Sequence, residues 1–103
     1  MTAIAVVTTV GSREEAQRLA RTLVERKLAA CAQISAIESI NRWKDAVQQE
    51  PEFRVLLKTT GERYAEVECA IRELHAYELP AIHAFAFEHI FPAYAAWIGE
   101  NVS

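Results

Sequence analysis

Hydrophobic positions recur along the chain with two periods, and the switches between them predict the order of its elements. Residues 3–9 form a short apolar run rich in β-branched side chains, which predicts a strand. Ser12 and Glu15 then fit a capping box, and hydrophobic residues return every three or four positions, as in a helix. The helix is expected to end near Lys27-Leu28, and its apolar stripe comprises Ala16, Leu19, Ala20, Leu23 and Val24.

The middle of the chain predicts two strands joined by a polar connection. Residues 32–43 are expected to form one long strand that ends at Trp43. Residues 44–51 are mostly polar and close with a proline, so they are interpreted as the connection of a hairpin. Residues 53–59 are expected to form the third strand.

The second half of the chain repeats the first. A helix is expected after Gly61, and residues 81–87 are expected to form a fourth strand. Pro92 suits the first turn of a last helix. The stripe of the first of these helices comprises Tyr64, Val67, Ile71 and Leu74, and that of the last comprises Tyr94, Trp97 and Ile98.

The order β-α-β-β-α-β followed by a C-terminal helix predicts an α+β, ferredoxin-like sandwich. In this fold a four-stranded antiparallel sheet carries its two main helices on one face. At 103 residues the chain is expected to be one domain, residues 1–103, with one hydrophobic core.

The predicted sheet is hydrophobic on both faces. In the first strand, Ile4 and Val6 point to one face while Ala5 and Val7 point to the other. Two helices can cover only one face, and a large apolar patch rarely stays exposed on a monomer. We therefore expect other copies of the chain to cover the second face, which makes the protein an obligate oligomer.

Charge and composition exclude several functions. A formal net charge of −3 argues against nucleic acid as the main partner. The apolar runs are far shorter than the roughly 18 residues needed for a membrane span, and the first residues lack a secretory signal, so a cytoplasmic location is expected. The chain has no nucleophile elbow, P-loop or dinucleotide fingerprint, and no enzymatic activity is expected.

The junction after the second helix holds the most informative cluster of side chains. His75, Tyr77 and Glu78 fall within four residues, and Pro80 closes the segment. His75 and Glu78 stand three positions apart, so on a last helical turn they would share a face as a metal-ligand or acid–base pair. The alternative is a helix C-terminus at which the histidine bonds the last carbonyl groups.

Further metal ligands are dispersed along the sequence. Cys31 lies where a helix gives way to a strand, either as a ligand or as a thiol without chemistry, and Cys69 is interpreted as a small apolar residue. His83 is expected to be a buried histidine, and His89 to lie in a loop. No pair has the spacing of a structural zinc site, so a copper or zinc site must combine distant segments or several subunits.

Two more residues have both a functional and a structural interpretation. Lys58 closes the third strand, where it either contacts an anion across a subunit boundary or extends along apolar surface to reach solvent. Trp43 is interpreted as an interface residue rather than as a platform for a ligand.

Seven short motifs together resemble the CutA family, the divalent-cation tolerance proteins. They occur in the family's order and cover about the whole chain. The resemblance implies a homotrimer of ferredoxin-like subunits, a link to copper and other divalent ions, and a trimer similar to the PII signalling proteins. The motifs are Leu28-Ala-Ala-Cys-Ala-Gln-Ile34, Ser39-Ile40, Trp43, Glu52, Leu57-Lys58-Thr59, His75-x-Tyr77-Glu78-x-Pro80 and Tyr94-x-x-Trp97-Ile98.

Carried over by motif, the resemblance implies a cleft between subunits. Trp43, Lys58, Tyr77 and Tyr94 are the expected ligand-binding residues, and Cys31, His75 and Glu78 the expected metal ligands. The alternative function is that of a PII-like sensor of a small ligand. The chain departs from the family's usual residues at Asn41, Asp45, Ala76 and Ala81.

Overall fold

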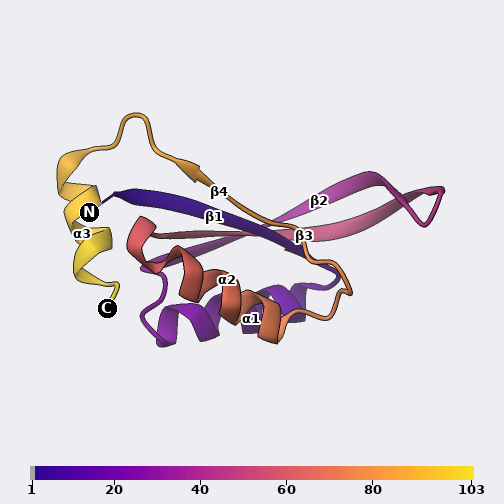
Figure 1. The fold of residues 1–103 in the computed structure, drawn as a ribbon, viewed down its shortest axis with the longest axis horizontal. Coiled ribbons are helices and arrows are strands. Elements are labelled where there is room, and N and C mark those ends of the chain that lie inside the picture. The colour runs from indigo at the N-terminus through magenta and orange to yellow at the C-terminus, as the bar shows by residue number, and fades with distance from the viewer. Residues whose placement is uncertain (1) are drawn as a thin grey trace.

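The strands and helices follow one another in the predicted order (Figure 1). The computed structural model describes residues 2–103; Met1, which the expected domain includes, lies outside the described residues. A short 3-10 turn, Gly61–Arg63, precedes α2. The elements are β1 (Ala3–Val10), α1 (Arg13–Glu25), β2 (Cys31–Trp43), β3 (Ala46–Thr60), α2 (Tyr64–Leu74), β4 (Ile82–Ala86) and α3 (Pro92–Glu100).

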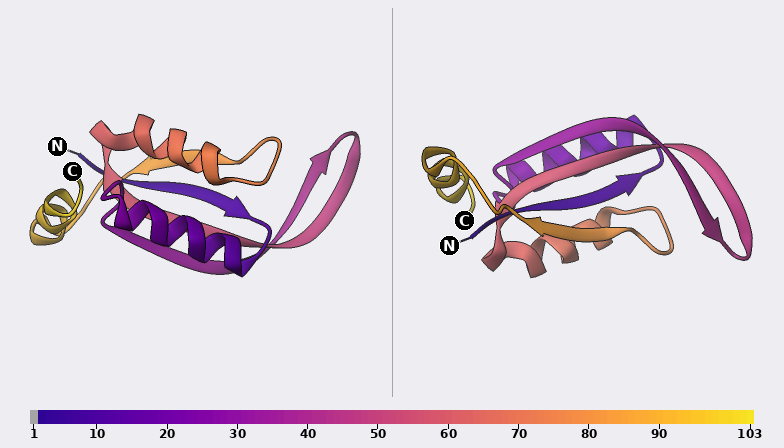
Figure 2. Two further views of the ribbon diagram at one scale, coloured as in Figure 1. Left: turned by 90° about the horizontal axis from the view of Figure 1, so that it is seen from below. Right: turned by 90° about the horizontal axis from the view of Figure 1, so that it is seen from above.

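The four strands form one antiparallel sheet in the order β2-β3-β1-β4. Helices α1 and α2 lie side by side on one face of this sheet, as Figures 1 and 2 show. This arrangement confirms the predicted α+β ferredoxin-like fold.

Helix α1 begins and ends where local chemistry requires it. The Ser12 side chain accepts a 3.1 Å hydrogen bond from the Glu15 backbone N–H, which confirms the predicted cap. The helix ends at Glu25, slightly before the predicted end, because Lys27 takes a left-handed conformation with φ 60°. Within the described chain, no helix combines the length and the apolar character that crossing a membrane requires.

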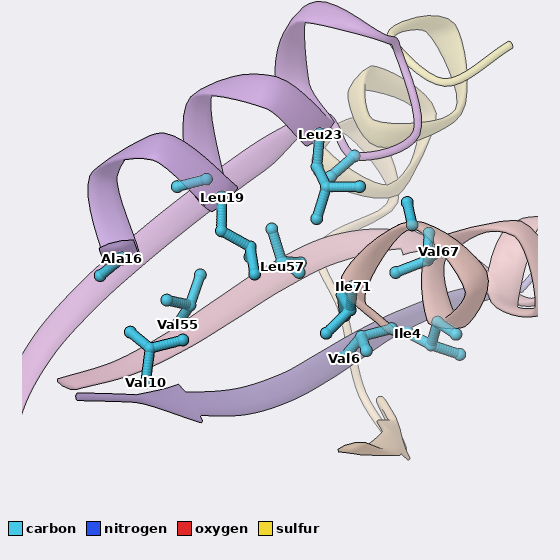
Figure 3. Packing of buried hydrophobic residues seen from close by; sticks show 13 residues of the cluster. Ile4, Val6, Val10, Ala16, Leu19, Leu23, Val55, Leu57, Val67 and Ile71 are labelled. Carbon is cyan, nitrogen blue, oxygen red and sulfur yellow. The ribbon is translucent and has the colours of Figure 1, made fainter. Parts of the chain in front are cut away.

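The core lies between the sheet and the two helices (Figure 3). Leu23 of α1, Ile71 of α2, and Val6, Val55 and Leu57 of the central strands are fully buried. The predicted stripe of α1 is confirmed except at Val24, which stays 38% exposed at the edge of the helix.

The hairpin between β2 and β3 is longer than the sequence predicts. Residues 44–51 are not a connection: the turn is only Lys44 and Asp45, with φ of 51° and 66°, and β3 already begins at Ala46. Pairing runs without interruption from Cys31 opposite Lys58 to Trp43 opposite Ala46. The prediction was wrong because this two-stranded ribbon extends beyond the helices (Figure 2), where both of its faces can carry polar side chains.

Helix α3 covers one end of the second face of the sheet. Lys58 points away from its core-facing neighbour Leu57, and its Nζ lies 3.0 Å from the hydroxyl of Tyr94 in α3. Ile98 of α3 is fully buried at this end. No other copy of the chain is therefore needed to cover this part of the second face.

The rest of the second face is open in the single chain. Phe85, on this face of β4, is 53% exposed. On the hairpin beyond the helices Ile40 and Val47 are 65% and 66% exposed, but by the strand register they lie on the other side, in line with core-facing Leu57. His83, expected to be buried, is exposed beside Phe85, because β4 is an edge strand and α3 covers only the Lys58 end of this face. Large apolar side chains thus remain uncovered, as the two-sided pattern predicts.

Candidate ligand groove

The segment after α2 is held against the end of β1 by its histidine. His75 leaves the helix with extended backbone angles, φ −85° and ψ 140°. Its Nδ1 accepts a 3.0 Å hydrogen bond from the Tyr77 backbone N–H, so the ring proton lies on Nε2. That Nε2–H donates to the Thr9 carbonyl oxygen over 2.7 Å. Both ring nitrogens therefore have protein partners. The carbonyl group that the ring bonds belongs to β1, and not to the last turn of α2 as the alternative interpretation of His75 expected.

Tyr77 joins this segment to the hairpin. Strand β1 ends at Val10, opposite Phe53 of β3. Glu52, the residue just before Phe53 in the chain, therefore has no residue of β1 beside it. The Tyr77 hydroxyl donates a 2.7 Å hydrogen bond to Oε2 of Glu52, whose residue is only 8% exposed. Burial, and then the adjacent Glu52 carboxylate, raise the pKa of Tyr77 above its ordinary value.

Gly11 leaves room for the Tyr77 ring beside the backbone. A Cβ atom added at Gly11 would lie 3.3 Å from the Tyr77 hydroxyl oxygen and 3.7 Å from its ring. The phenol ring therefore occupies space that a side chain at position 11 would compete for. Gly11 serves here through its small size, because its φ is not positive.

The hairpin and the segment after α2 enclose a groove of about 510 Å³. This volume falls within the range of small-molecule sites in proteins. Six of the lining residues stand at alternate positions of the two strands, so their side chains share the face that looks into the groove. They are Ser39, Asn41, Trp43, Gln48, Glu50 and Glu52. The lining residues are Ser39, Asn41, Arg42, Trp43, Gln48, Glu50, Glu52 and the run from Ala76 to Leu79.

Charged and aromatic groups meet at the outer end of the groove. The Lys44 Nζ lies 3.9 Å from Oε2 of Glu78 and 5.7 Å from the centre of the Trp43 ring. Both charged side chains are largely exposed. The expected site residues Trp43, Tyr77 and Glu78 thus lie in one groove.

Three further expected site residues, Lys58, Tyr94 and Cys31, lie at the other end of the sheet. Lys58 contacts Tyr94, whose ring stacks on Trp97 at 5.7 Å with an angle of 10° between the planes. Cys31 lies opposite Lys58 in the register, on the same face of the sheet. Lys58 and Glu52 stand six positions apart on β3, which is about 20 Å along an extended strand.

A single chain therefore does not bring the predicted metal ligands together. Cys31 lies at the Lys58 end of the sheet, whereas His75 and Glu78 lie at the groove end. Among residues 2–103, no three His, Cys, Asp or Glu side chains are placed to hold one metal ion.

Sequence reasoning missed four residues that shape the groove, namely Glu50, Glu52, Lys44 and Gly11. Glu52 appeared only within the family resemblance, and residues 44–51 were interpreted as a loop. The alternation of polar residues at 48, 50 and 52 was the available signal, because period-two spacing is typical of a strand.

Comparison with known proteins identifies relatives along nearly the whole chain. The model of the family described as CutA1 divalent ion tolerance protein matches residues 4–101. The chain is 38% identical over 94 residues to the divalent-cation tolerance protein CutA of Archaeoglobus fulgidus, covering 91% of this chain and 92% of the relative. It is 35% identical over 99 residues to the Thermotoga maritima protein of the same name, covering 96% and 98%.

Solved structures of CutA proteins share this fold along nearly the whole chain. The A. fulgidus structure, described as a periplasmic divalent cation tolerance protein CutA, matches with a TM-score of 0.95 at 36% identity, covering 98% of this chain and 99% of that one. CutA1 from Oryza sativa matches with a TM-score of 0.96 at 28% identity, covering 100% and 95%.

The sheet order, the helix layer and the long hairpin define a small α+β protein of the ferredoxin-like class. Within that class, the chain belongs to the CutA1 divalent ion tolerance protein family.

Proposed function

We propose that this protein works in divalent-cation tolerance as a homotrimer that binds copper or another divalent metal ion weakly between subunits, without enzymatic activity. Membership of the CutA1 family supports the cation-tolerance role. The trimer and the metal-binding residues are further parts of the proposal, and each has its own supporting observation.

The exposed apolar side chains carry the proposal of self-association. Phe85, Ile40 and Val47 are each more than half exposed in the single chain, on β4 and on the projecting hairpin. Each fully buried side chain of this size contributes roughly 1.5–3 kcal/mol to association before the entropic cost is subtracted. A second copy of the chain is the natural partner, because hairpin and sheet face are present on every copy.

The separation of the expected ligands supports a site shared between copies. Cys31 and Glu78 lie at opposite ends of one sheet, so only different subunits can place them around one ion. His75 would first have to release the Thr9 carbonyl oxygen before its Nε2 could bind a metal. That requirement agrees with weak binding.

Native mass spectrometry with and without copper or zinc tests both parts of the proposal. We expect a trimer and added metal, with less metal bound in the Cys31→Ala, His75→Ala and Glu78→Ala variants. Cys69→Ala is the thiol control: Cys69 is exposed on α2 and is not among the proposed ligands, although it lines a second pocket with Glu78. A monomer at micromolar concentration contradicts the assembly. Equal metal uptake by all variants contradicts the ligands.

The groove favours a second candidate function, that of a PII-like sensor of a small ligand. Its volume of about 510 Å³ and its mixed polar and aromatic lining are suited to an organic molecule. A thermal-shift screen of nucleotides and metabolites tests this candidate, and a flat response across the panel counts against it.

A further inference from the structure

The ammonium group of Lys44 lies in a position that an external ligand could take. It is placed between the Trp43 ring at 5.7 Å and the Glu78 carboxylate at 3.9 Å. An aromatic face beside a carboxylate is a typical environment for an alkylammonium group. Both charged side chains are exposed, so their attraction is weak and a competing cation can displace Lys44.

Deeper in the groove, Glu52 is a buried carboxylate without a counter-ion. It is 92% buried, and within residues 2–103 its side chain has one hydrogen-bond partner, the neutral hydroxyl of Tyr77, and no ion pair. Buried charges in proteins are usually paired with an opposite charge, because the loss of hydration is costly. The groove therefore has an acceptor for a cation that no side chain in the described chain supplies.

The groove as a whole is acidic. Three carboxylates, those of Glu50, Glu52 and Glu78, line it, against the single guanidinium of Arg42. The carboxylates come from two segments: β3 provides two, on the same face of the strand, and the segment after α2 provides the third. A ligand with positive charges spaced along a chain matches this distribution.

We propose that this groove binds a linear organic polycation, a diamine or polyamine, with Lys44 occupying the outer ammonium position when the ligand is absent. One ammonium group lies between Trp43 and Glu78, and another approaches Glu52 and Glu50. The proposal rests on the second candidate function, ligand sensing, and names the class of ligand. It does not require the metal site, and the residues that line the groove all belong to one chain.

An amine fits these residues better than a metal ion does. The carboxylates that line the groove are not grouped as a metal site needs, since no three ligand side chains within residues 2–103 converge on one point. An aromatic ring attracts an alkylammonium group through its face and packs on the adjoining methylene groups, whereas a small divalent ion keeps its water shell.

Titration followed by ¹H–¹⁵N NMR at low ionic strength tests the proposal on the whole protein. Spermidine and 1,4-diaminobutane are the ligands, and 1-aminobutane and 1,4-butanediol are the matched controls with one charge and no charge. We expect saturable shifts at the Trp43 indole and the Tyr77 amide, with the Trp97 indole unchanged. We expect the diamine to bind about tenfold more tightly than the monoamine, as for a second close charge pair.

Variants assign the effect to residues. Glu52→Gln and Glu78→Gln should each weaken spermidine binding about tenfold, while Glu14→Gln on the exposed face of α1 should not. Glutamine at 52 keeps an oxygen to accept the Tyr77 hydrogen bond, so the fold should persist, which unchanged amide spectra check. Lys44→Met should strengthen binding about two- to fivefold, because it removes the tethered competitor.

Three results overturn the proposal. One is an absence of saturation by spermidine at millimolar concentration. Another is equal binding of 1,4-butanediol or of magnesium ions, which would mean that the groove does not select amines. The third is unchanged affinity in both Glu52→Gln and Glu78→Gln. Metal uptake and subunit count are measured separately, so failure here is distinct from failure of the proposed metal-binding trimer.

Discussion

The hydroxyl of Tyr77 donates a 2.7 Å hydrogen bond to Oε2 of Glu52, and this contact joins the segment after α2 to the hairpin. The two residues stand 25 positions apart in sequence. Glu52 lies where β1 has just ended, so the phenol of Tyr77 covers a part of β3 that the sheet no longer covers. The inner end of the groove therefore depends on this one contact.

Replacing Tyr77 with phenylalanine should destabilise the fold by about 1–3 kcal/mol, because the buried Glu52 carboxylate loses its hydrogen-bond donor. Urea unfolding measures the change in the free energy of unfolding. Tyr94→Phe is the control, since the Tyr94 hydroxyl accepts a bond from the less buried Lys58 side chain and its loss should cost less. Equal losses in the two variants would contradict the special role of the Glu52 contact.

Gly11→Ala should lower the free energy of unfolding by about 1 kcal/mol, because the new methyl group displaces the Tyr77 ring. Gly61→Ala is the matched control: neither glycine has a positive φ, and a Cβ at Gly61 would meet only the Thr2 carbonyl oxygen at 3.8 Å. In a Tyr77→Ala background the cost of Gly11→Ala should disappear. A cost that persists there would assign the effect to the backbone instead.

Stability should fall as pH rises above the ordinary tyrosine pKa of 10.0. Burial and the Glu52 carboxylate raise the pKa of Tyr77 in the folded state, so the unfolded chain loses this proton at lower pH than the folded protein. The contribution of Tyr77 is complete below pH 10 and is lost progressively above it. Urea unfolding at several alkaline pH values measures this dependence, which should be shallower in Tyr77→Phe. Tyr64, whose pKa burial also raises, should account for part of what remains.

The hairpin turn should gain stability from residues suited to a left-handed backbone. Lys44 and Asp45 have φ of 51° and 66°, and such pairs of positions favour Asn-Gly. The double change Lys44→Asn with Asp45→Gly should raise the free energy of unfolding by about 1 kcal/mol. Asp45→Ala should lower it, because alanine lacks the local hydrogen bonds that help aspartate adopt this conformation. Equal effects of the two variants on thermal unfolding would contradict this explanation.

Periodicity in the sequence predicted most of the fold. The helical stripe through Leu19 and Leu23, the cap at Ser12 and the break at Pro80 all act over a few residues, so they can be recognised without knowledge of distant contacts. The hydrophobic character of both strand faces is local information of the same kind, and Phe85 is exposed on the second face as that pattern predicts.

The groove could be predicted only in part. The sequence drew attention to His75, Tyr77 and Glu78, because three such side chains rarely follow one another at a simple turn. It did not reveal the partners of these residues, since Thr9 and Glu52 come from remote strands and their pairing depends on where β1 ends.

The sequence by itself determined the order of the elements, the buried stripes and the presence of a special segment after α2, because these depend on neighbours within one or two turns. Only the tertiary structure decided that residues 46–52 belong to β3, that Cys31 and His75 lie at opposite ends of the sheet, and that Glu52 is buried under Tyr77. The physical reason is that strand length and burial here depend on pairing between distant segments. A polar ribbon such as residues 38–52 forms strands because its backbone groups bond across the hairpin, whatever the local preference of its side chains.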